Sequence, residues 1–534
     1  MSDYESASSC YETMVGKRRV YELRAEDCAE LTIPSLFPES GFNEAQQLET
    51  PYNSVGARGV NHLASKLTLS LVPPSQPFFR LTIDDKAQIQ LDQQPELKMV
   101  VNEALASIER RVSREIEIRA LRPAITYAIK LLIVTGNALV HLPDEGGIRV
   151  FPLKNYGVER DQMGNVKEIV LCEKLSKYAL PTDIKNFLGL DVEVEDEARE
   201  PGKEEYKLFT YVEMEEDGKY HIHQEIDGAI IPESVGSYEA EQLPFLALRW
   251  TAISGESYGR GLVEEILGDL VSLEALTKAI VIGSAASARV VGLVNPAGFT
   301  NASDLNKAEN GAFVLGNAAD VSFLQVQKGG DFQVAMQTMA AISRRVEASF
   351  LLNASVQRQA ERVTAEEVRL LAAELESALG GVYATLSQEL QLPMVRRMMA
   401  QLTEADNIPA IPKALKNFIH PAIITGVEAL GRMSDLERIR MWAGLVGQIM
   451  GPQAIPQVIN PEVFVQTVAT ALGLDIKGLV KTREQIAAEM QQAQAMQNAS
   501  SFTQAAAGPA ATGMMDIVKE AIATQQANAQ AEAE

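Results

Sequence analysis

Two long helical patterns joined by a short polar segment constrain the fold of this chain more than any other feature. Apolar residues recur every three or four positions from residue 332 to residue 350, which places them on one helix face. A second pattern of the same spacing covers residues 368–390, and the segment 353–363 between the two is polar. This spacing predicts two long helices, but a plain helical hairpin would produce the same pattern.

The second helix carries its own start and bend signals. Thr364 and Glu367 have the spacing of a capping box, in which each side chain bonds a free backbone amide at the start of a helix. Gly380 and Gly381 fall inside the pattern, where each glycine costs about 1 kcal/mol relative to alanine, so we expect a bend there. Pro393 should kink or end the helix because it lacks an amide proton.

The chain before residue 256 reads as an α+β block. Helical patterns cover 9–28, 51–71, 97–118 and 123–135, and a short strand pattern covers 79–83. From residue 137 to residue 250 the period changes to two, which predicts strands at 138–142, 148–151 and 166–172 with hairpin turns at Gly164 and Gly218. The acidic run 191–205 is expected to be a solvated excursion.

A small β module is expected between two of the long helices. One unbroken helix is predicted for 262–289, and the helix described first begins near residue 331. Between them, turns are marked by Asn295 and Asn310, and strands are predicted at 313–315 and 321–326. Further on, a proline-rich loop precedes helical segments at 426–448 and 461–472, and the Ala/Gln-rich tail 484–534 could be a helix or disordered. The fold class is therefore α+β and mainly helical.

Charge and composition narrow the possible functions. The 534 residues carry 71 acidic and 48 basic side chains, a net charge of −23, whereas tight unspecific binding of nucleic acid needs clustered cations. The three cysteines have no metal-ligand or disulfide-frame spacing. The polar start does not resemble a signal peptide, and the two most apolar windows, 124–142 and 279–294, are interrupted by a charge, so no membrane partner is expected.

The motifs of common catalytic and cofactor sites are missing. His221 and His223 share a strand face, but no third metal ligand stands near them, so no metal is predicted. Glycines at 255, 259 and 261 do not have the spacing of a phosphate loop, and residues 426–433 lack the lysine of a P-loop. We expect a protein that is not an enzyme, has no catalytic residue and binds no cofactor.

Three segments in order resemble one protein family. They are 51–73 (PYNSVGARGVNHLASKLTLSLVP), 249–270 (RWTAISGESYGRGLVEEILGDL) and 357–398 (QRQAERVTAEEVRLLAAELESALGGVYATLSQELQLPMVRRM). Together they resemble the portal proteins, or head-to-tail connectors, of short-tailed, podovirus-type phages. The resemblance covers most of residues 40–440, and the two ends of the chain match only in composition.

The resemblance implies a domain order and a set of partners. It implies a wing at 1–255, a first stem helix at 256–290, a clip at 291–330, a second stem helix at 331–352, a tunnel loop at 353–363, a long wing helix at 364–420, a crown at 421–483 and a tail at 484–534. It also implies a ring of twelve copies at one capsid vertex of the virion, assembled in the host cytoplasm. Genome DNA would pass through the ring, and the partners would be a packaging ATPase (terminase), a tail adaptor, and the major capsid and scaffolding proteins.

Within that picture a few residues are candidates for contact. Arg358, Arg362 and Gln357 in the polar segment, then Arg344 and Arg345 before it, could touch DNA phosphates weakly enough to allow sliding. Each arginine could instead form a salt bridge between subunits. Candidate contacts of the clip with the adaptor are Asn295, Asn310 and Phe313. The alternative function is a virion scaffold that assembles through its helices but encloses no DNA.

Overall fold

The structure is a computed structural model of the whole chain. It describes residues 6–42, 45–74, 78–144, 146–188, 205–287, 291–324, 329–352, 365–404 and 419–423, with residues 441, 444, 445 and 448 in addition. The chain divides into a first unit, Met1–Gly431, and a second unit, Arg432–Glu534. Almost all described residues belong to the first unit, which is the subject below.

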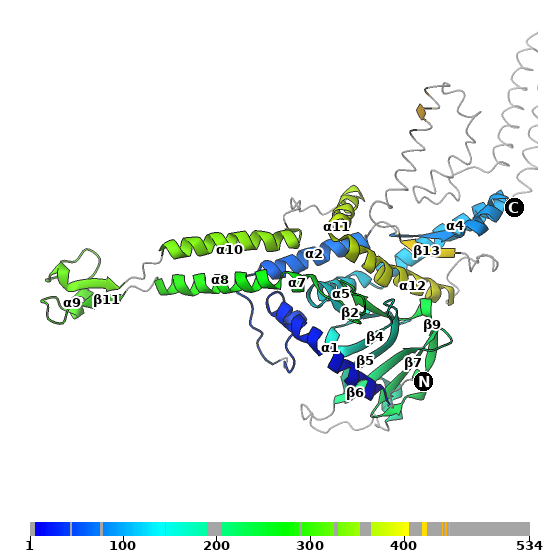
Figure 1. The fold of residues 1–534 in the computed structure, drawn as a ribbon, viewed down its shortest axis with the longest axis horizontal. Helices are drawn as coiled ribbons and strands as arrows, with labels where there is room; N and C mark the ends of the chain where they lie inside the picture. The colour runs from blue at the N-terminus through cyan, green and yellow to red at the C-terminus, as the bar shows by residue number, and fades with distance from the viewer. Residues whose placement is uncertain are drawn as a thin grey trace, which may run out of the picture. The chain divides into compact units, whose positions relative to one another are not determined.

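Helices alternate with short antiparallel sheets along the first unit (Figure 1). The helices are α1 (Ala7–Glu30), α2 (Val55–Leu71), α3 (Asp85–Asp92), α4 (Pro95–Ile118), α5 (Leu121–Thr135), α6 (Thr182–Phe187), α7 (Leu262–Glu265), α8 (Leu267–Ser287), α9 (Ala302–Lys307), α10 (Gly329–Ser349), α11 (Ala365–Leu386) and α12 (Leu392–Glu404). The strands are β1 (Phe79–Ile83), β2 (Asn137–His141), β3 (Arg149–Phe151), β4 (Tyr156–Arg160), β5 (Val166–Ser176), β6 (Glu205–Met214), β7 (Lys219–Ile226), β8 (Ala229–Ile230), β9 (Gly236–Glu239), β10 (Phe245–Arg249), β11 (Val291–Val294), β12 (Val321–Leu324) and β13 (Ile419–Ile423).

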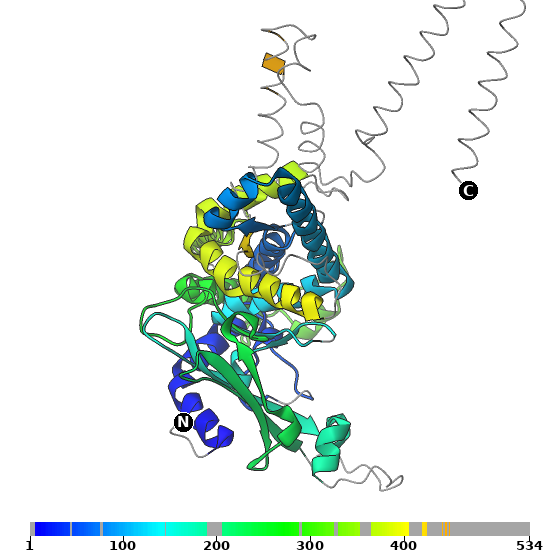
Figure 2. The same ribbon diagram turned by 90° about the vertical axis from the view of Figure 1, so that its right-hand side faces the viewer.

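The largest sheet is antiparallel and six-stranded. Its order is β4-β5-β6-β7-β8, and β9 also pairs with β7. The predicted turns at Gly164 and Gly218 are confirmed, because both glycines have positive φ at the hairpins that join β4 to β5 and β6 to β7. Helix α1 lies across one face of this sheet (Figure 2), where Cys10 and Met14 pack against Val170 and Phe209.

The main hydrophobic core lies between α2, α5 and a three-stranded sheet of order β10-β2-β3. α5 is apolar on nearly every side, which suits a fully buried helix. It ends at Gly136, whose φ of 77° is the left-handed conformation that caps many helices. Two-stranded β1-β13 then joins residues 79–83 to residues 419–423, segments far apart in the chain.

The helices α8 and α10 run side by side and antiparallel, as Figure 1 shows. Their contact includes Gly283, where a Cβ atom would lie only 2.7 Å from the Phe332 ring. The long helix predicted at 262–289 is wrong in one detail, because it is interrupted at Ile266, where α7 ends and α8 has not begun. The segment between α8 and α10 contains a small β module, as predicted, and β12 lies within the strand predicted at 321–326. Its partner β11 and the helix α9 were not indicated by the sequence patterns.

The expected bend in the long helix after residue 364 is confirmed. α11 is kinked at Leu379 (φ −123°, ψ 22°), directly before Gly380 and Gly381. Pro393 does not end the helix. A π-helical turn, Ser387–Gln391, precedes it and α12 continues to Glu404. Since Pro393 cannot donate to the preceding turn, a widened turn at this point lets the chain stay helical.

Candidate functional site

The two adjacent arginines at the end of α10 have different environments. Arg345 donates to Asp269 of α8, with 2.6 Å between its Nη2 and the carboxylate Oδ1, so it ties the two antiparallel helices together. Arg344 is exposed and makes no hydrogen bond or ion pair with any residue that the structure describes. Of the two, Arg344 is therefore the cation left available to a partner.

The other three residues predicted to contact DNA, Gln357, Arg358 and Arg362, lie outside the described residues. Their segment begins where α10 ends, and this end is fixed to α2. The buried Phe350 ring packs directly on Gly59, where a Cβ atom would lie 2.3 Å from the ring. Leu351 then turns into the left-handed region (φ 54°), and Lys66 donates to its carbonyl at 3.4 Å.

The chain returns to the same helix after the segment. The buried Tyr383 hydroxyl lies 2.9 Å from the Ser70 hydroxyl, and Gln391 donates to the carbonyl of Leu71 at 2.7 Å. Gln391 is fully buried and caps one of the carbonyls left free at the end of α2. Helix α2 thus holds the chain on both sides of the polar segment.

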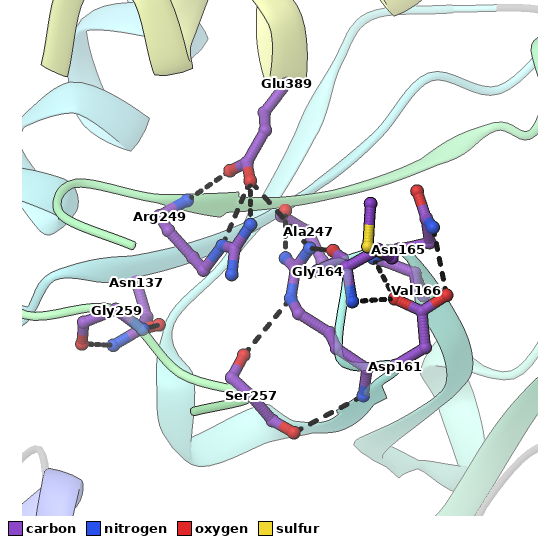
Figure 3. A network of polar contacts seen from close by, with 12 residues as sticks. Asn137, Asp161, Gly164, Asn165, Val166, Ala247, Arg249, Ser257, Gly259 and Glu389 are labelled. Atoms are coloured by element: carbon purple, nitrogen blue, oxygen red, sulfur yellow. Dashed lines mark hydrogen bonds and ion pairs between the residues drawn. The ribbon is translucent and has the colours of Figure 1, made fainter. Parts of the chain in front are cut away.

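A buried charge network joins the π-helical turn to the sheet below it (Figure 3). Both oxygens of Glu389 accept from Arg249: Oε1 from Nε at 3.0 Å and Nη2 at 2.6 Å, and Oε2 from the backbone amide at 2.9 Å. The Arg160 guanidinium lies 3.8 Å from the same carboxylate and donates to the carbonyl of Ala247 at 2.7 Å. Only 4% of the Arg160 side chain and 17% of the Glu389 side chain are exposed.

The glycine-rich segment after β10 serves close packing. Asn137 and Gly259 exchange two hydrogen bonds, one from the Asn137 side-chain amide at 2.8 Å and one from the Gly259 backbone at 2.7 Å. A Cβ atom on Gly259 would meet the carbonyl of Gly136 at 2.8 Å, and one on Gly261 would meet the carbonyl of Ile133 at the same distance. This segment leads directly into α7, and Gly259 and Gly261 are required by the close backbone contacts.

The module at 291–324 exposes several aromatic and aliphatic side chains. Phe313 is fully exposed, and the strand predicted at 313–315 is wrong, because these residues form no ladder. Asn310 is exposed, whereas the Asn295 side chain accepts from the Ala297 amide at 3.0 Å and so stabilises its own turn. Phe299 and Leu315 are equally exposed. Leu315 falls in the predicted strand 313–315 and Phe299 follows Ala297 and Gly298, so no sequence pattern marked either side chain as exposed.

Titratable groups in the described residues are mostly structural. No group of three or more histidine, cysteine or acidic side chains among them could hold a metal ion. His221 lies 3.3 Å from Asp217, its neighbour across the hairpin turn. Burial raises the pKa of the Cys10 and Cys28 thiols to about 12, and the Glu168 carboxylate adds to the effect at Cys10.

Helix α8 presents most of its apolar surface to the outside. By length and composition alone it could cross a membrane, and only 11% of its most apolar window is buried. Val271, Val281 and Ile282 are about half exposed, as are Val334 and Met336 on α10. These exposed apolar side chains lie on two adjoining helices, α8 and α10.

Comparison with known proteins identifies the family. The family model of bacteriophage head to tail connecting proteins matches residues 5–480. This chain belongs to that family. It is 42% identical to the portal protein of Escherichia phage T7 over 504 residues, which cover 92% of this chain and 91% of the relative. It is 41% identical to the portal protein of Enterobacteria phage T3 over 538 residues, with 98% of each chain covered.

A more distant relative and one solved structure complete the comparison. The portal protein of Enterobacteria phage SP6 is 31% identical over 495 residues, which cover 92% of each chain. This chain is also similar to a chain from the neck of an empty gene transfer agent (GTA) particle, computed with C6 symmetry. The alignment covers 72% of this chain and 86% of the other, at 10% identity. Its TM-score is 0.36.

Proposed function

We propose that this chain is the portal protein of a tailed phage. Copies of it form a ring at one vertex of the capsid, and genome DNA enters and leaves through the hole. Family membership over residues 5–480 and near-complete coverage of portal relatives carry this proposal. In this function the protein is a structural conduit and catalyses no reaction.

The domain order proposed for the chain follows the family. The wing is 1–255, the first stem helix 256–290, the clip 291–330, the second stem helix 331–352, the tunnel loop 353–363, the long wing helix 364–420, the crown 421–483 and the tail 484–534. The antiparallel pair α8 and α10 fits the two stem helices, and the β11-β12 hairpin with α9 fits the clip.

Ring contacts are proposed for the exposed apolar faces of α8 and α10. In a ring each copy meets two neighbours through different surfaces. Val271, Ile282, Val334 and Met336 would be covered by the neighbouring helix pairs, which removes their apolar area from water. A neighbouring copy explains the exposed apolar surface of α8 without a membrane.

The DNA contacts are proposed for four side chains on the channel side, three arginines and one glutamine. Arg358, Arg362 and Gln357 would form the inner contact in the tunnel loop, with Arg344 on the helix before it. Arg345 takes a lesser part because Asp269 already holds it. A net charge of −23 keeps the polyanion from adhering to the wall, and a few dispersed cations bind too weakly to stop it sliding.

The exposed side chains of the 291–330 module fit contact with a tail adaptor. Phe299, Phe313 and Leu315 offer apolar anchors of the kind that protein interfaces bury, and Asn310 is exposed in the same module. The remaining proposed partners are the packaging ATPase, the major capsid protein and the scaffolding protein. The proposed location is the portal vertex of the virion, after assembly in the host cytoplasm.

Imaging of the purified chain tests the ring. Negative-stain electron microscopy should show rings with a central hole, and the mass of the particles should give the copy number. Val271→Glu combined with Val334→Glu should leave single folded chains, whereas Lys219→Glu, on the exposed surface of the six-stranded sheet, should not disturb the ring. Particles without a hole would favour the non-channel scaffold instead.

A double substitution tests the loop. Arg358→Ala with Arg362→Ala should leave rings intact and reduce packaging or retention of DNA in particles built with the variant. The control is Lys17→Ala with Lys219→Ala, which removes the same charge from two exposed lysines paired with Glu159 and Glu239. Normal packaging and retention in the arginine variant would refute the role of the loop.

A further inference from the structure

The C-terminal half of α4 is unusually basic for this chain. Residues 109–122 carry five arginines and three glutamates, although the whole chain has 71 acidic and 48 basic residues. The segment covers the last turns of α4 and the start of α5. None of the functions proposed above involves these arginines.

The three glutamates of this segment are already engaged. Glu115 pairs with Arg119 at 2.7 Å, and Glu117 pairs with Arg122 at 3.3 Å. Glu109 is buried, and its carboxylate accepts from the amide of Leu81 at 2.8 Å. These bonds satisfy Arg119 and Arg122, and they engage all three carboxylates of the segment.

Arg111 has an interaction of its own, so Arg110 and Arg114 are the arginines left over. Both are exposed, and neither makes a hydrogen bond or ion pair within the described part of the chain. They stand four positions apart, which places them side by side on one face of the helix, where like charges repel. Arg80 is also exposed and unpaired among the described residues. It precedes Leu81, whose bond to Glu109 ties β1 to this turn of α4.

Adjacent arginines without carboxylates suit a partner with regularly spaced negative charge. A guanidinium donates two parallel hydrogen bonds to a phosphate, which makes arginine the preferred side chain for phosphate contacts. Neighbouring side chains one helical turn apart can reach successive groups of one backbone strand. Binding to the phosphates of a DNA duplex requires no contact with the bases, and the guanidinium groups of this surface are suited to phosphates alone.

We propose that Arg110 and Arg114, with Arg80 beside them, form a second phosphate-contacting surface for duplex DNA, separate from the 353–363 loop. The proposal rests on the proposed function, which supplies DNA as the partner. DNA binding at this surface does not depend on the DNA sequence, and it is weak because only two or three phosphates are contacted. It adds a place where DNA touches the wing outside the loop.

Salt-dependent binding of DNA to assembled rings tests the surface. A fluorescent duplex of mixed sequence is titrated with rings of the Arg358→Ala, Arg362→Ala background at several salt concentrations. Arg110→Gln with Arg114→Gln should reduce the slope of log affinity against log salt by about 1.8, since each lost phosphate contact contributes about 0.9. Arg80→Gln alone should reduce it by about 0.9. The control, Lys17→Gln with Lys219→Gln, should leave it unchanged.

Three results discriminate between the possible explanations. An unchanged slope in the Arg110 and Arg114 variant would overturn the proposal, and so would folded single chains that no longer form rings, because the arginines would then contact a neighbouring copy. If the unsubstituted chain forms no ring, the proposed function fails by itself. The same titration on single chains would then still support the phosphate surface if the slope fell, and reject it if it did not.

Discussion

Removing the Glu389 carboxylate should destabilise the contact between the π-helical turn and the sheet by about 3–5 kcal/mol. This is the range for breaking a buried ion pair by deleting one partner, which leaves the other charge buried and uncompensated. Glu389→Ala takes away the acceptor of three bonds from Arg249 and the only carboxylate within 4 Å of Arg160 among the described residues. Glu389→Gln keeps the shape and one oxygen acceptor, so we expect a smaller loss of about 2 kcal/mol.

Fluorescence of Trp250 offers a local assay. This residue follows Arg249 and is buried, and the only other tryptophan, Trp442, can be replaced by phenylalanine. Urea unfolding followed at Trp250 reports the part of the chain around the ion pair, which matters because a chain of this size need not unfold in one step. Lys17→Ala, at an exposed ion pair, serves as the control and should leave the midpoint unchanged.

A double-mutant cycle separates the ion pair from the general effect of truncation. Arg249→Met combined with Glu389→Leu should cost less than the sum of the two single substitutions, because neither charge is then left alone. Arg160 stays satisfied in all variants by three backbone carbonyls, including that of Ala247. A loss below about 1 kcal/mol in Glu389→Ala, the value of an exposed pair, would refute the reasoning.

Three further predictions concern packing and titration. Gly59→Ala should destabilise the chain by about 1–3 kcal/mol in denaturant unfolding because the methyl group would enter the Phe350 ring, whereas Gly16→Ala in α1, which has open space, should not destabilise it. Cys10, with its pKa raised to about 12, should resist thiol reagents at pH 8 until the chain is unfolded; rapid reaction of the folded chain would contradict its burial. Burial lowers the pKa of His141 to about 4, with Arg149 and Arg397 adding to the effect, so stability should fall as the pH drops from about 6.5 to about 4, and His141→Asn should flatten that fall in unfolding curves measured across this range.

The periodicity of the sequence predicted most of the helices and strands. The strand at 79–83 is correct to the residue, and the helix at 97–118 is short by only two residues at its start. These segments have clear alternation and lie next to prolines, which limit where an element can begin or end. The bend at Gly380 was predictable for the same local reason.

The errors arose where contacts outside the local pattern decide the structure. Residues 313–315 have the composition of a strand but pair with nothing in the single chain, and a strand needs a partner to form. The break at Ile266 leaves no trace in the apolar spacing. Of the two outcomes expected at Pro393, a kink or an end, the end is wrong, because a change of helix type absorbs the missing amide.

The candidate site was predictable only in part. Arg344 and Arg345 look alike in the sequence, and only the place of Asp269 on the adjacent helix distinguishes them. The contact between Arg249 and Glu389 joins residues 140 positions apart, which no periodicity signals. The unpaired state of Arg110 is likewise visible only after the bonds of the neighbouring glutamates are known.

Helix α2 has a mechanical consequence for whatever touches the chain between Leu352 and Leu379. Gly59 contacts Phe350 before that span and Ser70 contacts Tyr383 after it, and these two positions lie about 16 Å apart along the helix at about 1.5 Å per residue. A force applied to this span would therefore act on one helix, α2, at two separate points.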